Sequence, residues 1–201
     1  MTPGGWRDAA DLAPGDRVME RVTERLSPLQ WEVVLGGLMG DGALSPNRSG
    51  HAARFRWGHG RKQVEYADWK ASLFANVGTS RTTNAKDAVF HDMKPLPELA
   101  ELRHSVYVGG RKVLSEEYLK ALTPLALAIW YQDNGGFQLR AKGLQERASD
   151  GSGRSEICVQ AFSPGSRDRL VEYLADTWDL HPRLHLRGAR QMATLSFPKD
   201  E

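Results

Sequence analysis

The sequence has one cysteine, no long hydrophobic run and little net charge. Cys158 cannot form a disulfide within the chain, and a lone cysteine suits a reducing compartment. It lies in the apolar, strand-like run Ile157–Val159, so we expect it to be buried. No apolar run approaches about 20 residues, and residues 1–25 have no signal-peptide core. We therefore expect a cytoplasmic protein without a membrane-spanning helix.

The length and the charge limit the classes of fold and partner. The 201 residues suit one domain or two small fused halves, and the 40% hydrophobic content is enough to form a core. The net charge is only +2 at pH 7. A chain this weakly basic can bind nucleic acid only if its basic residues are concentrated on one surface.

Two stretches share an unusual pattern, Leu29–Leu44 and Leu122–Phe137. Each predicts an apolar helix rich in small residues that ends in an acidic corner, Asp41-Gly42 in the first and Asp133-Asn134-Gly135 in the second. Glycine costs a helix interior roughly 1 kcal/mol relative to alanine. The glycines of the first helix therefore suggest that another backbone packs closely against it. One such corner alone would indicate only a helix C-cap, where glycine is common.

The remaining pattern repeats in the same order in both halves of the chain. In the strand His51–Trp57, Phe55 and Trp57 lie on one face and Arg54 and Arg56 on the other, although a plain solvated face would alternate in the same way. The other expected elements are the helices Gln63–Val77, Pro95–Tyr107 and Pro164–Trp178, the strands Thr79–Thr83, Ala88–Met93, Gly136–Arg140, Ser155–Phe162, Arg183–Leu186 and Gln191–Phe197, and the loops Ser45–Gly50 and Lys142–Arg154. In the Gln63–Val77 helix we expect Tyr66, Trp69, Leu73 and Phe74 to face inward. The periodicity predicts a two-fold α+β repeat whose last helix is missing.

The two motif stretches resemble the paired motifs of single-chain LAGLIDADG homing endonucleases. The resemblance rests on Gly36-Leu-Met-Gly-Asp41-Gly42 and Trp130-Tyr-Gln-Asp-Asn134-Gly135, which lie at the separation typical of that family. It implies an α+β fold of two pseudo-symmetric αββαββα halves, packed through the two LAGLIDADG-like helices, with an antiparallel β-saddle for DNA. The halves would span 27–110 and 111–201, and the second would lack its C-terminal helix.

Residues 1–26 form an N-terminal arm in this interpretation. Its Gly5-Trp6 and Leu12-Ala-Pro-Gly15-Asp16-Arg-Val18 resemble the segment of inteins that precedes their endonuclease insertion. This resemblance suggests a chain cut out of an intein, and we expect no splicing, since no nucleophile opens the chain and no His-Asn closes it. An ordinary N-terminal arm is the alternative.

The family resemblance also implies a metal-dependent hydrolase that acts on phosphodiester bonds of double-stranded DNA. The acidic residue before each motif glycine would bind Mg²⁺ or Mn²⁺ and act in catalysis, at Asp41 and Asn134, with the carbonyl oxygens of Gly40 and Asp133 beside them. Asn134 departs from the family pattern, because its amide brings no negative charge. Asp133 cannot simply replace it, since one helical step turns a side chain by about 100°. We expect an impaired second site, and cleavage, nicking, or DNA binding without cleavage all remain open.

Further residues are assigned by the resemblance alone. Lys112 corresponds to a lysine near the family's active centre, although a solvated linker lysine fits equally well, and Lys199 is its loose counterpart in the second half. His59 and Gln63 fall where the family has residues that organise water, although His59 also fits an ordinary loop histidine. The partner would be a long asymmetric DNA site bound by a monomer, which would make the protein nucleoid-associated when bound. The candidate DNA-binding residues are Arg48, Arg54, Arg56, Arg61, Lys62, Arg81, Lys86, Arg140, Lys142, Arg147, Arg154, Arg183, Arg187 and Arg190.

Overall fold

The computed structural model describes residues 8–16, 25–139, 153–188 and 192–197. The first half contains α1 (Pro28–Met39), β1 (Ala43–Pro46), β2 (Ala53–His59), α2 (Val64–Ser72), β3 (Thr79–Thr83), β4 (Val89–Met93) and α3 (Pro97–Val106). The connection contains β5 (Tyr107–Val108), β6 (Arg111–Lys112) and α4 (Glu116–Lys120). The second half contains α5 (Pro124–Asn134), β7 (Gly135–Leu139), β8 (Gly153–Cys158), α6 (Pro164–Trp178), β9 (Arg183–Arg187) and β10 (Met192–Phe197). Two short 3₁₀ turns, Ala9–Asp11 and Arg61–Gln63, complete the described elements.

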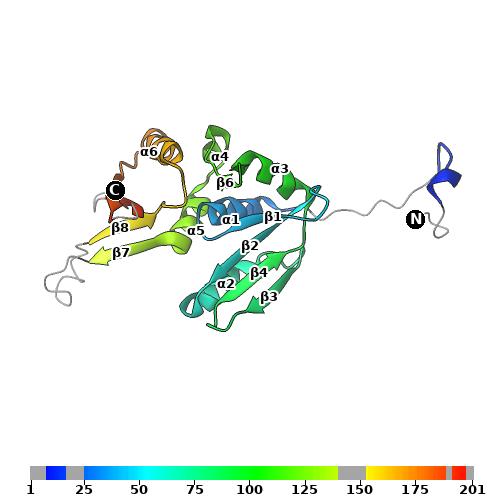
Figure 1. Ribbon diagram of the computed structural model, residues 1–201, viewed down its shortest axis with the longest axis horizontal. Helices are drawn as coiled ribbons and strands as arrows, with labels where there is room; N and C mark the ends of the chain where they lie inside the picture. Colours follow the sequence, from blue (N-terminus) through cyan, green and yellow to red (C-terminus); the bar gives the residue numbers. More distant parts are fainter. Residues whose placement is uncertain (1–7, 17–24, 140–152, 189–191, 198–201) are drawn as a thin grey trace.

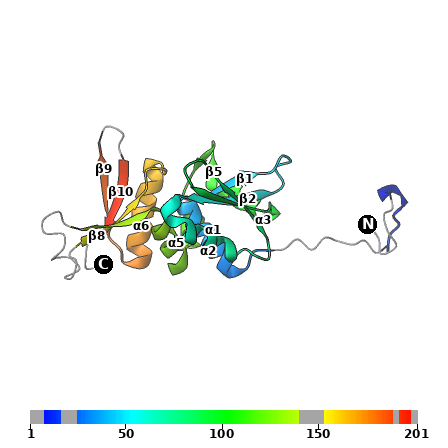
Figure 2. The same cartoon turned by 90° about the horizontal axis from the view of Figure 1, so that it is seen from below.

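Each half is built around an antiparallel four-stranded sheet. The strand orders, β1-β2-β4-β3 and β7-β8-β10-β9, are equivalent, so the two halves repeat the same topology. Figures 1 and 2 show the two sheets on opposite sides of the central pair α1 and α5. The expected α+β repeat is therefore confirmed. No counterpart of α3 follows β10 within the described residues.

Small residues allow α1 and α5 to pack closely. A Cβ atom added to Gly36 would lie 2.3 Å from the carbonyl oxygen of Ala126, and one added to Gly40 would lie 2.3 Å from the Cβ of Asp133. Both helices begin with an N-cap hydroxyl followed by proline, from Ser27 in α1 and Thr123 in α5. Gly36 and Gly40 are thus explained by contact between the helices, as the sequence suggested, whereas a Cβ atom added to Gly37 would meet the Phe55 ring at 2.6 Å.

The helix-covered face of the first sheet carries the core of that half. Phe55 and Trp57 are buried on it, and the Trp57 indole donates a hydrogen bond to the backbone of Ala67 in α2. The prediction that Trp69 faces inward is wrong, because its side chain is 46% exposed and stacks on Tyr66 at the surface. The inward position one residue further along α2 belongs to Lys70.

Other departures from the sequence expectations are local. The sequence did not predict the β5–β6 hairpin at the glycines 109 and 110, nor α4 after it. Cys158 is only partly buried, because it lies on the opposite face of β8 from the buried Ile157. Among the described residues, no helix is long and apolar enough to cross a bilayer.

The second half exposes apolar surface that the first half covers. Phe137 of β7 is 53% exposed, whereas its counterpart Leu44 in β1 is buried. An apolar cavity of about 340 Å³ lies between α5, α6 and the sheet, and Trp130, Ile157 and Leu174 line it with five further residues. In the first half α3 packs against β1 and β2, so the difference follows from the absence of a described helix at the matching place.

Candidate active site at the junction of the two motif helices

The C-terminal ends of α1 and α5 bring Asp41 and Asn134 together. One end of the Asn134 amide lies 3.2 Å from both Asp41 Oδ1 and the carbonyl oxygen of Asp133. When that end is the nitrogen, it donates hydrogen bonds to both oxygens. When it is the oxygen, three acceptors converge, and the amide nitrogen instead lies 3.5 Å from the Cys158 carbonyl.

The second amide orientation is the one that a cation would require. A carboxylate, an amide oxygen and a backbone carbonyl are the kind of ligands that Mg²⁺ and similar hard cations prefer, with waters completing the shell. Within the described residues, no group of three or more His, Cys, Asp or Glu side chains is arranged to hold a metal ion. A cation here would therefore depend on amide and backbone oxygens as well as on Asp41. The residues present fit that role, with one negative charge where the family pattern has two.

Lys112 reaches the same corner from the β5–β6 hairpin. Its Nζ donates hydrogen bonds to the carbonyl oxygens of Leu38, at 2.8 Å, and Gly42, at 2.6 Å, and lies 3.4 Å from that of Gly40. Burial lowers the pKa of Lys112 to about 8, although Asp41 and Asp133 oppose the shift. The alternative of a solvated linker lysine is therefore wrong. Lys112 stays largely protonated at pH 7 and places a positive charge beside Asp41.

The side chain of Asp133 takes a different direction from that of Asn134. It is fully buried between α5 and α2, where Oδ1 accepts hydrogen bonds from Lys70 Nζ at 2.7 Å and from the Tyr66 hydroxyl at 2.9 Å. The Lys70 ammonium also lies 4.6 Å from the centre of the Tyr66 ring. Burial lowers the pKa of Lys70, and the pairing with Asp133 opposes this shift. The carboxylate of Asp133 is thus already held by an ammonium group, while its backbone carbonyl stays at the candidate cation site.

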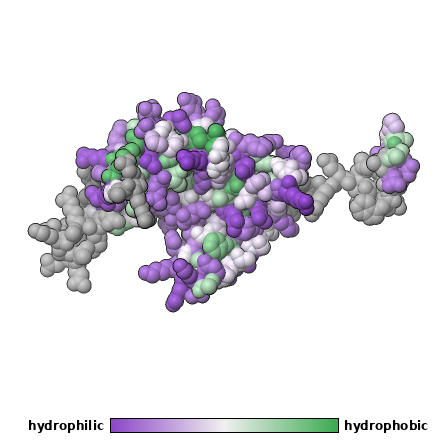
Figure 3. Space-filling view, in the orientation of Figure 1, coloured by the Kyte–Doolittle hydropathy of each residue, from purple (hydrophilic) through white to green (hydrophobic). Residues whose placement is uncertain are grey.

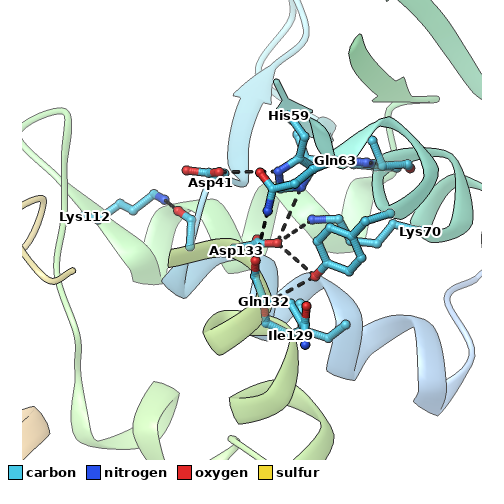
Figure 4. A network of polar contacts seen from close by, with 12 residues as sticks. Asp41, His59, Gln63, Lys70, Lys112, Ile129, Gln132 and Asp133 are labelled. Carbon is cyan, nitrogen blue, oxygen red and sulfur yellow. Dashed lines mark hydrogen bonds and ion pairs between the residues drawn. The ribbon is translucent and has the colours of Figure 1, made fainter. Parts of the chain in front are cut away.

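His59 connects the two acidic side chains. Its Nδ1 lies 3.5 Å from Asp41 Oδ2, and its Nε2 lies 3.5 Å from Asp133 Oδ1. Neither ring nitrogen is within hydrogen-bonding geometry of a partner. Burial and the Lys70 charge lower the pKa of His59 to about 4, so the imidazole is neutral at pH 7. Figure 4 shows His59 and Lys112 on opposite sides of Asp41.

The electrostatics of Asp41 reflect this crowding. Burial is the largest cause that raises the pKa of Asp41, and the neighbouring Asp133 carboxylate raises it further. Lys70 and Lys112 lower it. Gln63 lies at the edge of the site, where its amide donates to the Gln132 carbonyl at 3.4 Å. The structure therefore brings together all of the candidate catalytic and water-organising side chains from the sequence.

Sequence reasoning missed Lys70 and the hydrogen-bonding role of Tyr66. Both lie on α2, and a signal existed, since Tyr66, Lys70 and Phe74 follow the i, i+4, i+8 spacing of one helix face. A lysine in an otherwise buried stripe requires a buried anionic partner. Nothing in the sequence indicated that this partner would come from Asp133.

All of the candidate DNA-binding residues except Arg81 fall into three groups. Arg54, Arg56, Arg154, Arg183 and Arg187 lie on the open faces of the two sheets, which we define as the faces opposite the buried core residues. Arg48, Arg61, Lys62 and Lys86 are exposed in turns, and Arg140, Lys142, Arg147 and Arg190 lie outside the described residues, as does Lys199. Figure 3 shows hydrophilic residues over most of one face of the molecule.

Arg81 does not belong to the open face. It is the cross-strand partner of the buried His91, and its Nε pairs with Asp68 of α2 at 2.9 Å. Arg81 therefore faces the helices rather than the open face, so its position does not support the expected role in DNA binding, which stays a prediction. The sequence could not show this, because the run Thr79–Thr83 has no apolar residue that would mark its inner face.

Comparison with known proteins identifies the family. Residues 31–201 match the model of the LAGLIDADG DNA endonuclease family. The chain belongs to this family.

Relatives of this LAGLIDADG chain include proteins named RecA and an mRNA maturase. It is 61% identical over 198 residues to "Protein RecA" of Mycolicibacterium chitae and 59% identical to that of Mycolicibacterium flavescens, with 98% of this chain covered in each. The chain spans about half the length of these relatives, 47% in both. It is also 27% identical to the cytochrome b mRNA maturase bI2 of Debaryomyces hansenii, over 84% of this chain and 64% of the maturase.

Solved structures of LAGLIDADG proteins share the fold. The homing endonuclease I-WcaI bound to its DNA recognition sequence matches 94% of this chain and 85% of its own with a TM-score of 0.72 at 14% identity. I-DmoI in complex with DNA and Mn matches 85% of this chain and 90% of its own with a TM-score of 0.51 at 12% identity. At these identities the likeness establishes the α+β architecture alone.

Proposed function

We propose that this chain is the endonuclease domain of an intein inserted in RecA, and that it cleaves a specific site in double-stranded DNA with the help of Mg²⁺ or Mn²⁺. The observation that carries the proposal is the meeting of Asp41, the Asn134 amide and the Asp133 carbonyl within 3.2 Å at the crossing of α1 and α5. Relatives named RecA that extend well beyond the matched region support the host assignment. DNA and Mn in the I-DmoI complex support the ligand classes.

The residues of the site would divide the work of hydrolysis. Asp41, the Asn134 amide oxygen and the Asp133 carbonyl would hold a divalent cation, which when bound supplies a polarised water and offsets phosphate charge. Lys112 would place a positive charge beside the reacting phosphate. His59, neutral and wedged between two carboxylates, would orient water at the Asp41 side, and Gln63 would border the same space. The chain would act in the cytoplasm on the nucleoid, as a monomer on a long asymmetric target.

A second function is favoured by Asn134 itself. Compared with an aspartate, this amide removes one negative charge from the cation site, a deficit worth several kcal/mol at low effective dielectric. The alternative is therefore a DNA-binding domain that recognises its site without double-strand cleavage. Asn134→Asp separates the two possibilities because it restores the missing charge without changing the size of the side chain.

The test uses a duplex that carries the uninterrupted recA sequence around the insertion point. The wild-type chain, Asn134→Asp and Asp41→Asn are incubated with this duplex and with a shuffled duplex, in Mg²⁺, Mn²⁺ or EDTA. We expect site-specific, salt-dependent binding by all three variants, stronger double-strand cleavage by Asn134→Asp, and no cleavage by Asp41→Asn. Equal cleavage by the wild type and Asn134→Asp would refute the placement of the second centre. Equal binding of both duplexes would refute site recognition altogether.

A further inference from the structure

The open face of the first sheet carries a carboxylate among its arginines. Asp92 of β4 is the cross-strand partner of Arg56 in β2, and Arg54 lies two residues earlier on the same face. Asp92 Oδ1 lies 3.4 Å from Arg54 Nε and 3.5 Å from Arg56 Nε. This oxygen is buried and accepts no hydrogen bond from the described residues. A single carboxylate thus lies beneath two guanidinium groups.

The second sheet contains the same arrangement. Glu156 of β8 lies on the open face, since the neighbouring Ile157 is buried on the other. Glu156 Oε1 lies 2.8 Å from Arg154 Nε and 2.9 Å from Arg187 Nη2. One covered carboxylate thus lies beside two arginines here too, at shorter distances, and the arginines come from β8 and β9.

The two clusters lie at equivalent places in the repeat. The residue two positions after Asp41 pairs with Arg56, and the residue two positions after Asn134 pairs with Glu156. Arg56 and Glu156 therefore correspond to each other, and the acid is on β4 in the first half and on β8 in the second. Both halves place one acid on the same cross-strand row, although the residue types are not repeated. Each half thus has one acid beside two arginines at this row of its sheet, although the acid is on a different strand in each half. This recurrence suggests that the cluster of acid and arginines has a function.

The geometry leaves the arginines available to a ligand. The carboxylates are covered, with 18% exposure for the Asp92 side chain and 8% for Glu156, whereas the four arginine side chains are 43–51% exposed. In three of the four pairs the contact recorded is that of Nε, in Arg54, Arg56 and Arg154. The two terminal nitrogens of an arginine form the fork that binds O6 and N7 of guanine in the major groove.

A carboxylate on this face has an electrostatic cost for a protein that binds DNA. Each acid repels phosphate, so replacing it by its amide should strengthen binding to any duplex. Its presence requires a benefit that depends on base sequence. Holding a flexible arginine in place before binding is such a benefit, because it lowers the entropy lost when the guanidinium docks on one base.

We propose that Asp92 and Glu156 are positioning residues that orient the arginines of the two sheets toward guanines in the major groove of a DNA target. This inference rests on the proposed function, since it requires binding to double-stranded DNA. It predicts that the acids contribute specificity at the expense of general affinity. A carboxylate that only stabilised the fold would change affinity for all sequences alike.

The experiment measures base discrimination in EDTA at fixed salt, so that no strand is cut. The preferred duplex of the wild-type chain is selected from a randomised library, and each of its base pairs is then substituted in turn. Arg154→Lys keeps the charge but removes the fork, and its loss of discrimination identifies the base pairs that Arg154 reads. We expect Glu156→Gln to lower discrimination about tenfold at those same pairs. Its affinity for a random duplex should stay equal or rise. Asp92→Asn should act in the same way at the pairs identified by Arg54→Lys.

Matched controls are available on α6. Glu172→Gln and Asp176→Asn remove the same charges from exposed positions of this helix, which packs behind the second sheet, and should leave base discrimination unchanged. Discrimination kept by Glu156→Gln, or an equal loss of affinity for every duplex, overturns the inference while the proposed function stands. A wild-type chain that selects no sequence from the library overturns both. Glu156→Asp, which keeps the charge, should retain part of the discrimination.

Discussion

The buried pair of Lys70 and Asp133 allows a sharp test of how the two halves are joined. Both side chains are fully buried, and their contact of 2.7 Å links α2 of the first half to α5 of the second. Removing one partner of a buried ion pair leaves the other charge uncompensated, which typically costs about 3–5 kcal/mol. Lys70→Met keeps most of the side-chain volume beside Tyr66, so lost packing should add little.

We expect Lys70→Met to lower the free energy of unfolding by about 3 kcal/mol, near the low end of that range. The reason is that the Tyr66 hydroxyl still donates to Asp133 at 2.9 Å and offsets part of the loss. For a chain of this size, such a change lowers Tm by roughly 10 °C. Urea and thermal denaturation followed by circular dichroism measure both quantities.

The double variant Lys70→Met/Asp133→Asn provides the decisive comparison. Because it removes both charges, it should be more stable than Lys70→Met alone, and with the single variant Asp133→Asn it completes a double-mutant cycle that gives the coupling energy of the pair. A Lys70→Met variant as stable as the wild type, or a double variant whose loss of stability equals the sum of the two single losses, would refute the idea that this ion pair holds the halves together.

Three further predictions concern the helix contact and the site. Gly36→Ala should destabilise the fold by about 1–3 kcal/mol, since its Cβ would meet the Ala126 carbonyl, whereas Gly165→Ala in open space should be neutral or stabilising; urea denaturation of both variants tests this. The pKa of His59 falls from 6.5 to about 4 on folding, so unfolded chains take up the proton first and stability is lost as pH falls from 6.5 to 4. In His59→Gln the free energy of unfolding should fall by up to about 3 kcal/mol less over this pH range than in the wild type. If the variant and the wild type show the same pH profile of unfolding in EDTA, the imidazole is not buried in its neutral form. Lys112→Met should lower the cleavage rate about 100-fold while DNA affinity in EDTA changes little, and a parallel loss of both would instead indicate a role in binding.

Local patterns were enough to predict much of the architecture. The alternation of Phe55 and Trp57 with arginines and the acidic corners after both apolar helices each depend on neighbours within a few residues. Such signals predicted the repeat and the two apolar helices rich in small residues, whereas the packing of the halves through these helices and the paired roles of Asp41 and Asn134 were what the family resemblance implied. The β5–β6 hairpin escaped notice because two-residue strands carry too few side chains to show a period.

Contacts between distant segments were beyond these patterns. Arg81 and Arg54 look alike in the sequence, yet Arg81 pairs with Asp68 behind the sheet, and only the register of β3 against β4 decides this. The family resemblance assigned a role only to the backbone carbonyl of Asp133. In the structure its side chain pairs with Lys70, which lies 63 residues earlier in the chain.

By itself, the sequence determined where helices and strands form and which two corners carry the polar residues, because these depend on periodicity, capping and glycine. The tertiary structure alone decided which charges become partners. Burial between α2 and α5 makes Lys70 and Asp133 a pair, and burial also keeps His59 neutral. The pairing of the strands places Asp92 and Glu156 beside the arginines of the open faces. The physical reason is that the strength of a charge interaction depends on distance and desolvation, and neither quantity exists until the chain has folded.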